Sequence, residues 1–170
     1  GSVPRVRGLD DFFLFPTDDA EEAARLTVDV VVRRIPARFG LDPVRDVQVL
    51  CPMNRGVLGA RNLNIQLQEV LNPNPPTKVE RFGWRFSPGD RVMETQNDYD
   101  REVFNGDLGM VVRIDDEEGA LIASFDGREV AYPFGELDTL DWTGDAARIR
   151  ERADDDPILV VAEGRGAEPR

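Results

Sequence analysis

The sequence has no histidine, and Cys51 is the single cysteine among its 170 residues. Without histidine the chain lacks the commonest general base and the commonest metal ligand of proteins. Serine–histidine and cysteine–histidine nucleophilic pairs are excluded for the same reason. One cysteine cannot form an internal disulfide, which fits a reducing cytoplasm. We therefore predict no catalytic residue and no metal site, and we expect a cytoplasmic location.

Long apolar runs are also missing. No stretch approaches the ~18 uninterrupted apolar residues that a membrane-spanning helix needs, so we expect no membrane association. No secretory signal is visible either. The pattern G-x-x-x-x-G-K-[ST], which cradles nucleotide phosphates, does not occur. Because phosphoryl transfer depends on that loop and its lysine, we expect no ATP hydrolysis by this chain alone. Gly1-Ser2 resembles an expression scar, so we expect the chain to be cut from a longer protein.

The charge is acidic and unevenly spread. The net charge of -12 argues against a protein that simply attracts phosphates. Residues 1–80 carry 10 basic and 11 acidic side chains, whereas residues 81–140 carry 6 basic and 14 acidic ones. The first half can therefore present a local basic face, while the second half repels phosphates on average. Lys78 is the only lysine, a bias that a GC-rich genome explains better than a binding site does.

Residues 1–76 have the alternation of strands and helices that is typical of an α/β domain. Asp18 and Glu21 have the spacing of a capping box, and they predict the start of a helix. Pro36 and Gly40 are expected to end it. The other elements expected here are strands at 11–15 and 47–51 and a second helix at 58–71 whose leucines point inward.

A stiff proline-rich segment, residues 73–76, predicts a domain boundary. Beyond it the period becomes that of β-strands, expected at 90–95, 109–114, 121–125 and 129–134. Asn105-Gly106 and Asp126-Gly127 are hairpin signals between them. Strands and turns without helices predict an SH3-like barrel over residues 77–140. Residues 141–170 remain unassigned, apart from a strand expected at 157–162 that would return to the α/β domain and a tail.

The turn at residues 52–56 is the first candidate site. Arg55 and Gly56 follow a buried strand and precede a helix, a place where α/β proteins bind ligands. Gly56 allows close backbone approach, and Arg55 can reach a phosphate. The alternative is an arginine that forms a salt bridge across the turn.

Two further groups could contact nucleic acid. Arg61, Asn64 and Gln68 share the polar face of the helix and suit contacts to a nucleic-acid backbone or to a neighbouring domain. Asn97 and Tyr99 lie in a polar loop, where Tyr99 could stack on a base. Trp84 and Arg85 have a weaker claim to the same role. The alternative for the helix group is an ordinary solvated helix face. The alternative for the loop group is turn chemistry, with Phe104 expected in the core.

Four segments together resemble the RecD/TraA-like superfamily 1 DNA helicases. They are residues 11–15, 34–43, 48–73 and 88–109, which follow in the order of that family. The resemblance implies the second RecA-like motor domain, of the P-loop NTPase type, with an inserted all-β SH3-like barrel. The family couples ATP hydrolysis to 5′-to-3′ movement along single-stranded DNA.

The resemblance also implies site roles. Residues 48–59 correspond to motif IV of the family, so Asn54, Arg55 and Gly56 would face ATP or the cleft between motor domains. ATP and Mg²⁺ would bind the full-length parent but not this chain alone. The expected partners are single-stranded DNA and the remaining motor domain. Residues 140–145 depart from the His-Lys-Ser-Gln-Gly-type segment of the family. A rival interpretation is an SH3-like adaptor that binds a protein and has no role with DNA.

Overall fold

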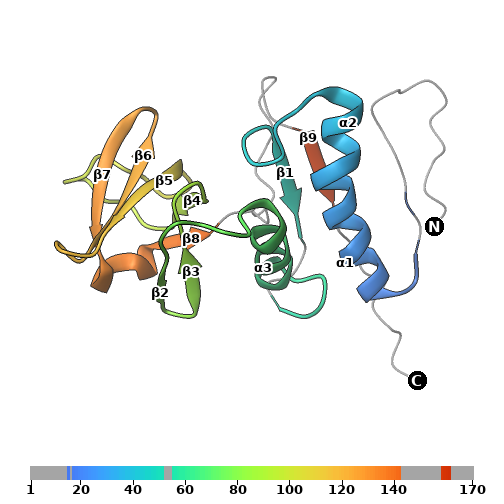
Figure 1. Ribbon diagram of the computed structural model, residues 1–170, viewed down its shortest axis with the longest axis horizontal. Coiled ribbons are helices and arrows are strands. Elements are labelled where there is room, and N and C mark those ends of the chain that lie inside the picture. Colours follow the sequence, from blue (N-terminus) through green and yellow to red (C-terminus); the bar gives the residue numbers. More distant parts are fainter. Residues whose placement is uncertain (1–14, 16, 52–54, 143–157, 162–170) are drawn as a thin grey trace.

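The computed structural model describes residues 15, 17–51, 55–142 and 158–161. Helices α1, α2 and α3 and the strand pair β1–β9 form an α/β part, and strands β2 to β8 form a β module beside it (Figure 1). The chain is therefore a mixed α/β protein, as the sequence predicts.

A long helical segment opens the α/β part. It consists of α1 (Ala20–Asp29), a π-helical turn (Val30–Arg34) and α2 (Ile35–Phe39). Asp19, rather than Asp18, caps its start by accepting the backbone N–H groups of Glu21 and Glu22. Gly40 ends the segment with a φ of 70°, as expected for a left-handed cap.

Pro36 does not end this helical segment, so the expectation of a stop there is wrong. The proline lies at the start of α2, directly after the π-helical turn in which the Ile35 N–H bonds the Val30 carbonyl. A proline inside a regular α-helix clashes with the carbonyl four residues earlier and leaves it without a donor. The wider π-helical turn relieves that conflict, and the helix continues.

The α/β part contains a parallel strand pair. β1 (Val47–Leu50) pairs in parallel with β9 (Ile158–Val161), and Val47 lies opposite Ile158. Helix α3 (Ala60–Leu71) follows β1 and buries Leu63 and Leu67 completely. A strand is thus present where residues 157–162 predicted one. The strand expected at 11–15 lies outside the described residues, apart from Phe15.

The β module is built around a five-stranded antiparallel sheet with the order β7-β6-β5-β4-β8. A separate two-stranded hairpin, β2–β3, precedes it, and a 3-10 helix (Phe134–Thr139) leads into β8. The strands are β2 (Val79–Arg81), β3 (Trp84–Phe86), β4 (Arg91–Glu94), β5 (Leu108–Asp115), β6 (Ala120–Phe125), β7 (Arg128–Pro133) and β8 (Leu140–Trp142).

Four of these strands, β4 to β7, lie where the sequence predicts them. The sheet is open, however, because the end strands β7 and β8 do not pair with each other, so the closed barrel is not confirmed. Asn105-Gly106 does not form a tight hairpin either. It lies in a long loop between β4 and β5, where the Asp107 N–H bonds the Phe104 carbonyl. The boundary at residue 76 remains a prediction.

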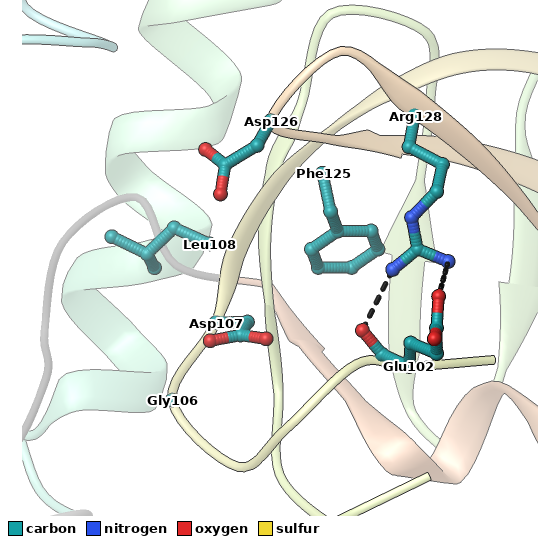
Figure 2. A pocket seen from close by; sticks show the side chains of 7 residues that line it. All are labelled: Glu102, Gly106, Asp107, Leu108, Phe125, Asp126 and Arg128. Carbon is teal, nitrogen blue, oxygen red and sulfur yellow. Dashed lines mark hydrogen bonds and ion pairs between the residues drawn. The ribbon is translucent and has the colours of Figure 1, made fainter. Parts of the chain in front are cut away.

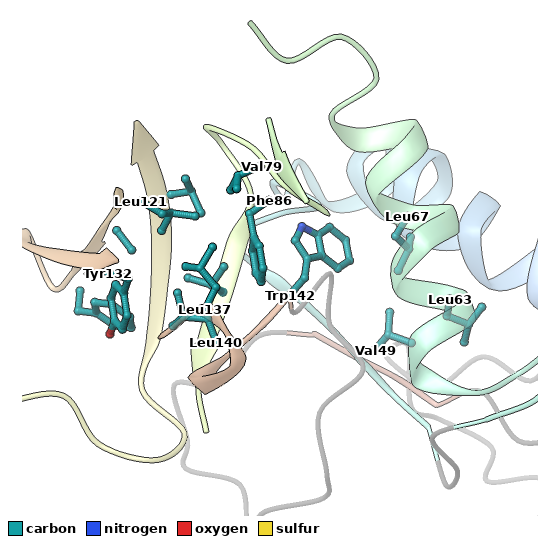
Figure 3. Close-up of a cluster of buried hydrophobic side chains, with 14 of the residues drawn as sticks. Val49, Leu63, Leu67, Val79, Phe86, Leu121, Tyr132, Leu137, Leu140 and Trp142 are labelled. Carbon is teal, nitrogen blue, oxygen red and sulfur yellow. The ribbon is translucent and has the colours of Figure 1, made fainter. Parts of the chain in front are cut away.

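One continuous apolar core joins the two parts. Trp142 and Phe86, buried at the edge of the β module, lie between its central side chains and those of α3 (Figure 3). Leu63 and Leu67 face this junction from α3. Helix α3 therefore contributes to a core that holds side chains of both the α/β part and the β module.

Candidate nucleic-acid interface

The turn before α3 places Arg55 beside the first turn of a helix. Gly59 is the N-cap, and a Cβ on it would lie 2.5 Å from the carbonyl carbon of Arg55, so this position requires glycine. Gly56 has a φ of 93°, which also favours glycine. Arg55 is exposed and has no hydrogen-bond or ion-pair partner among the residues that the structure describes. Asn54 lies outside the described residues.

The amide side chains of α3 point into the β module. Asn64 and Gln68 are 5% and 6% exposed, so neither is accessible to a nucleic acid. The Asn64 Nδ2 donates to the Trp142 carbonyl at 2.7 Å, and the Gln68 Nε2 donates to the Arg85 carbonyl at 2.8 Å. The structure thus places both residues in contact with a neighbouring part of the protein, which is the second of the two contacts expected for this face.

Asp90 is the centre of this contact, and the sequence reasoning missed it. Its carboxylate accepts from Gln68 at 2.6 Å, from Asn72 at 2.8 Å and from the backbone N–H of Ser87 at 2.8 Å. Burial raises the pKa of Asp90, while the bonds from Asn72 and Gln68 act in the opposite direction. Asn72 continues the spacing of Asn64 and Gln68 by one further turn, and that spacing was the available signal. Together these groups hold α3 against the β module.

Arg91 makes a second connection between the parts. Although it is only 7% exposed, its guanidinium reaches β1 and donates to the carbonyls of Val44 and Val47 at 3.2 and 3.3 Å. A buried arginine that bonds carbonyls is positioned by packing rather than available to a phosphate.

Arg61 lies on the exposed side of α3, apart from the buried amides. Its guanidinium stacks 5.3 Å from the centre of the Trp84 ring and donates to the Gly83 carbonyl at 3.2 Å. Neither contact neutralises its charge, so Arg61 remains available to an anion. Arg85 is half-buried, and its Nε has no hydrogen-bond partner among the described residues.

The loop between β4 and β5 carries Asn97 and Tyr99. Tyr99 is 74% exposed, and its ring meets that of Phe104 edge-on, with centroids 5.8 Å apart. Phe104 is 43% exposed, so the expectation that it lies in the core is wrong. Val103 is the core residue of this loop. Asn97 has a structural role here, because its Oδ1 accepts the backbone N–H of Asn105 at 3.0 Å.

Charged groups brace this loop from within. Asp98 and Val103 pair across it, and the guanidinium of Arg101 bridges Asp98 at 2.8 Å and Glu136 at 2.5 Å. The backbone N–H of Arg101 also bonds Asp98 and is the main reason that the pKa of this carboxyl is lowered. At the start of the loop Glu94 is buried and accepts from the Tyr132 hydroxyl at 2.9 Å. The aromatic pair is therefore displayed on a rigid base.

A pocket beside this loop is poorly suited to phosphate. Three carboxylates line it, those of Glu102, Asp107 and Asp126, with the Phe125 ring between them (Figure 2). The only cation in the lining, Arg128, already donates to the carbonyls of Arg101 and Glu102. An anionic ligand would meet net repulsion there.

No helix in the described part of the chain is long and apolar enough to cross a membrane. The same residues contain no group of three histidine, cysteine, aspartate or glutamate side chains placed to hold a metal ion. Cys51 is half-buried, and burial raises the pKa of its thiol to about 11.

Comparison with known proteins finds a match that spans most of α3 and strands β2 to β6. Residues 63–125 match the family described as the SH3 domain of ATP-dependent RecD-like DNA helicases. The match begins inside α3, so it includes Asn64, Gln68 and Asn72, whose amides bond α3 to the β module. Over 92 residues the chain is 46% identical to the ATP-dependent RecD2 DNA helicase of Deinococcus radiodurans. That alignment covers 54% of this chain and 12% of the relative, so the chain spans a small fraction of the helicase.

Solved structures of Pif1 from Bacteroides sp. are also similar in part. The complex with ADP-AlF4 is 17% identical, with a TM-score of 0.39, over 65% of this chain and 26% of that one. The unliganded form is 18% identical, with a TM-score of 0.38, over 52% of this chain and 31% of that one. These partial overlaps carry no further conclusion. Residues 63–125 are therefore similar to the SH3 domain of RecD-like DNA helicases, and about half of the chain is similar to one such helicase.

Proposed function

We propose that this chain contributes single-stranded DNA binding to an ATP-dependent helicase that moves 5′ to 3′, and that it forms one wall of the ATP cleft. The observation that carries the DNA-binding role is the exposed pair of Tyr99 and Phe104 on a braced loop. Stacking on aromatic rings binds single strands without regard to sequence, as a motor requires. The pair also lies inside the matched segment, residues 63–125.

A salt titration of DNA binding tests this role. We expect the 170-residue chain to bind a thymidine oligonucleotide, and we expect the affinity to fall as salt rises because counterions are released from the phosphates. Because the β module is acidic, we expect few phosphate contacts and therefore a shallow slope of log affinity against log salt concentration. A chain that does not bind at low salt would refute the DNA role.

The ATP role depends on Arg55. This arginine is exposed beside the start of α3, without a partner in the described part of the chain, and Gly56 leaves room for close approach. A phosphate at this point would meet both a guanidinium and the backbone N–H groups of a helix start. ATP and Mg²⁺ would be held mainly by the rest of the parent protein.

Arg55→Ala in the full-length parent tests the ATP role. Loss of a charge-assisted contact costs ~1.5–3 kcal/mol, so we expect ATP turnover to fall roughly ten- to hundredfold while DNA binding changes little. Arg45→Ala, at another exposed arginine of the α/β part, is the matched control. Unchanged ATP turnover in a folded Arg55→Ala protein would show that Arg55 does not contact ATP.

A protein-binding adaptor is the second candidate function. It is favoured by the three carboxylates around the pocket near Phe125, which suit a basic peptide better than DNA. If this reading holds, Asp126→Asn would weaken capture of a basic peptide, and thymidine oligonucleotides would not bind at any salt concentration.

A further inference from the structure

The turn of the β2–β3 hairpin has an unusual residue at its tip. Arg81 pairs with Trp84, which leaves Phe82 and Gly83 as a two-residue turn. Both have positive φ, 52° and 80°, as a type I′ turn requires. Asparagine, aspartate and glycine tolerate the first of these positions, whereas a bulky aromatic side chain is disfavoured there. The chain therefore retains Phe82 at a conformational cost.

Packing of the Phe82 side chain does not offset this conformational cost. Phe82 is 56% exposed, and its ring has no aromatic or cationic partner among the described residues. Backbone strain at an exposed side chain is more often associated with recognition than with stability. The turn itself projects from the lower edge of the fold, where α3 begins (Figure 1).

Two arginines, Arg61 and Arg81, lie close to the turn that carries this ring. Arg61 reaches the turn and donates to the Gly83 carbonyl at 3.2 Å, while its guanidinium lies over the next ring, Trp84. Arg81, the residue before the turn, stacks on Phe134 at 5.7 Å and donates to the Glu80 carbonyl. Neither guanidinium pairs with a carboxylate in the described part of the chain. In a protein with a net charge of -12, this is a local concentration of unneutralised positive charge.

We infer that the β2–β3 turn is a second contact for single-stranded nucleic acid, in which a base stacks on Phe82 and the adjoining phosphate binds Arg61. A nucleotide offers an aromatic face and an anion at neighbouring positions, which is what the turn presents in complementary form. An acidic peptide would match the arginines but leave the strained ring without a purpose. The inference rests on the proposed DNA-binding function and adds a site to it.

Phe82→Asn tests the inference because we expect it to raise thermal stability and to lower the affinity for DNA. Asn-Gly is the preferred sequence for this turn, so we expect the melting temperature to rise by a few degrees. We expect the affinity for a thymidine oligonucleotide to fall about 5- to 150-fold, the range for loss of one stacked base. Phe82→Tyr keeps the ring and should bind like the wild type. A merely structural Phe82 would not yield a protein that is more stable and binds more weakly.

The outcomes separate this site from the proposed function. If Phe82→Asn binds the oligonucleotide as the wild type does, while Tyr99→Ala binds more weakly, the second contact is refuted and the DNA role stands. If the wild-type chain does not bind the oligonucleotide at low salt, the DNA role and the second contact both fail.

Discussion

Two exposed aromatic sites on one β module differ in almost every respect except exposure. In the β4–β5 loop, the ring of Tyr99 leans on Phe104, and the loop is braced by Asp98 and Arg101. At the β2–β3 turn, Phe82 is alone and its backbone is strained. The loop carries mostly carboxylates, whereas the turn has unneutralised arginines. Exposure therefore identifies both sites, but charge and conformational cost distinguish what each can bind.

The sites also differ in what supports them. The loop is held within the β module, by bonds to Glu136 and to the backbone around β4. At the β2–β3 turn, the Gly83 carbonyl accepts a hydrogen bond from Arg61 of α3. The geometry of this site therefore depends on how α3 packs on the β module. Changes at the α3 contact should consequently affect the turn and spare the loop.

Asp90→Ala is the change from which we expect the largest effect. It removes the shared acceptor of Gln68, Asn72 and the Ser87 N–H, and leaving buried donors unsatisfied should lower the free energy of unfolding by about 3 kcal/mol. Chemical denaturation measures this. Asp116→Ala, in an exposed turn, is the control.

The same variant sharpens the comparison of the two sites. Hydrogen exchange should increase in α3 and in the β2–β3 hairpin but not in residues 98–103. Equal loosening of both regions would show that the loop depends on α3 after all.

Tyr99→Ala should weaken oligonucleotide binding about five- to tenfold, near the lower end of the ~1–3 kcal/mol range for a stacked base. The ring is already in T-shaped contact with Phe104, so less of its surface is available to a base. Because Tyr99 is 74% exposed, the melting temperature should change little. A drop of several degrees with unchanged DNA affinity would make Tyr99 a packing residue.

Arg61→Gln should reduce the slope of log affinity against log salt by about one, since it removes one phosphate contact. Tyr99→Ala should leave that slope unchanged, because stacking releases no counterions. This pair of measurements tests whether charge separates the two sites. Equal slopes in wild type and Arg61→Gln would contradict the assignment of a phosphate to Arg61.

Lowering the pH should affect the β4–β5 loop but not the β2–β3 turn, and this is the smallest effect that we expect. The lowered pKa of Asp98 means that its stabilising contribution is present above its unfolded value of about 3.9 and is lost as pH falls through the folded value. Asp90 has the opposite sign, because a raised pKa increases stability as pH falls. Residue-specific NMR should therefore show Arg101 and Tyr99 shifting below about pH 4 while Phe82 does not. Simultaneous shifts at Phe82 would contradict the independence of the β2–β3 turn from the β4–β5 loop.

The sequence predicted the regular parts of the β module well and its junction poorly. Strands β5 to β7 were predictable because short apolar runs are separated there by turns that contain glycine. The β2–β3 hairpin was missed because its strands are only three residues long and Phe-Gly is not a recognised turn signal. Asn64 and Gln68 were assigned to a polar face correctly, but the sequence could not reveal that the β module covers that face.

The candidate sites show the same division. Exposure of Tyr99 followed from its polar neighbours, whereas exposure of Phe104 depends on the turn that bonds its N–H to Asp107. The role of Arg61 beside Gly83 needs two segments that are distant in the chain, and no local pattern encodes it.

The parallel pairing of Val47 with Ile158 has a consequence for the order of folding. The whole β module lies in the chain between these two strands, and closing so long a loop costs entropy before any contact repays it. The hairpins β5–β6 and β6–β7 involve near neighbours and should form first. Once the module has folded, β8 ends against α3 through Trp142, which brings the returning chain towards β1. The inserted module would thus act as the scaffold on which the α/β sheet assembles, and a lesion in the module would delay the pairing of β1 with β9.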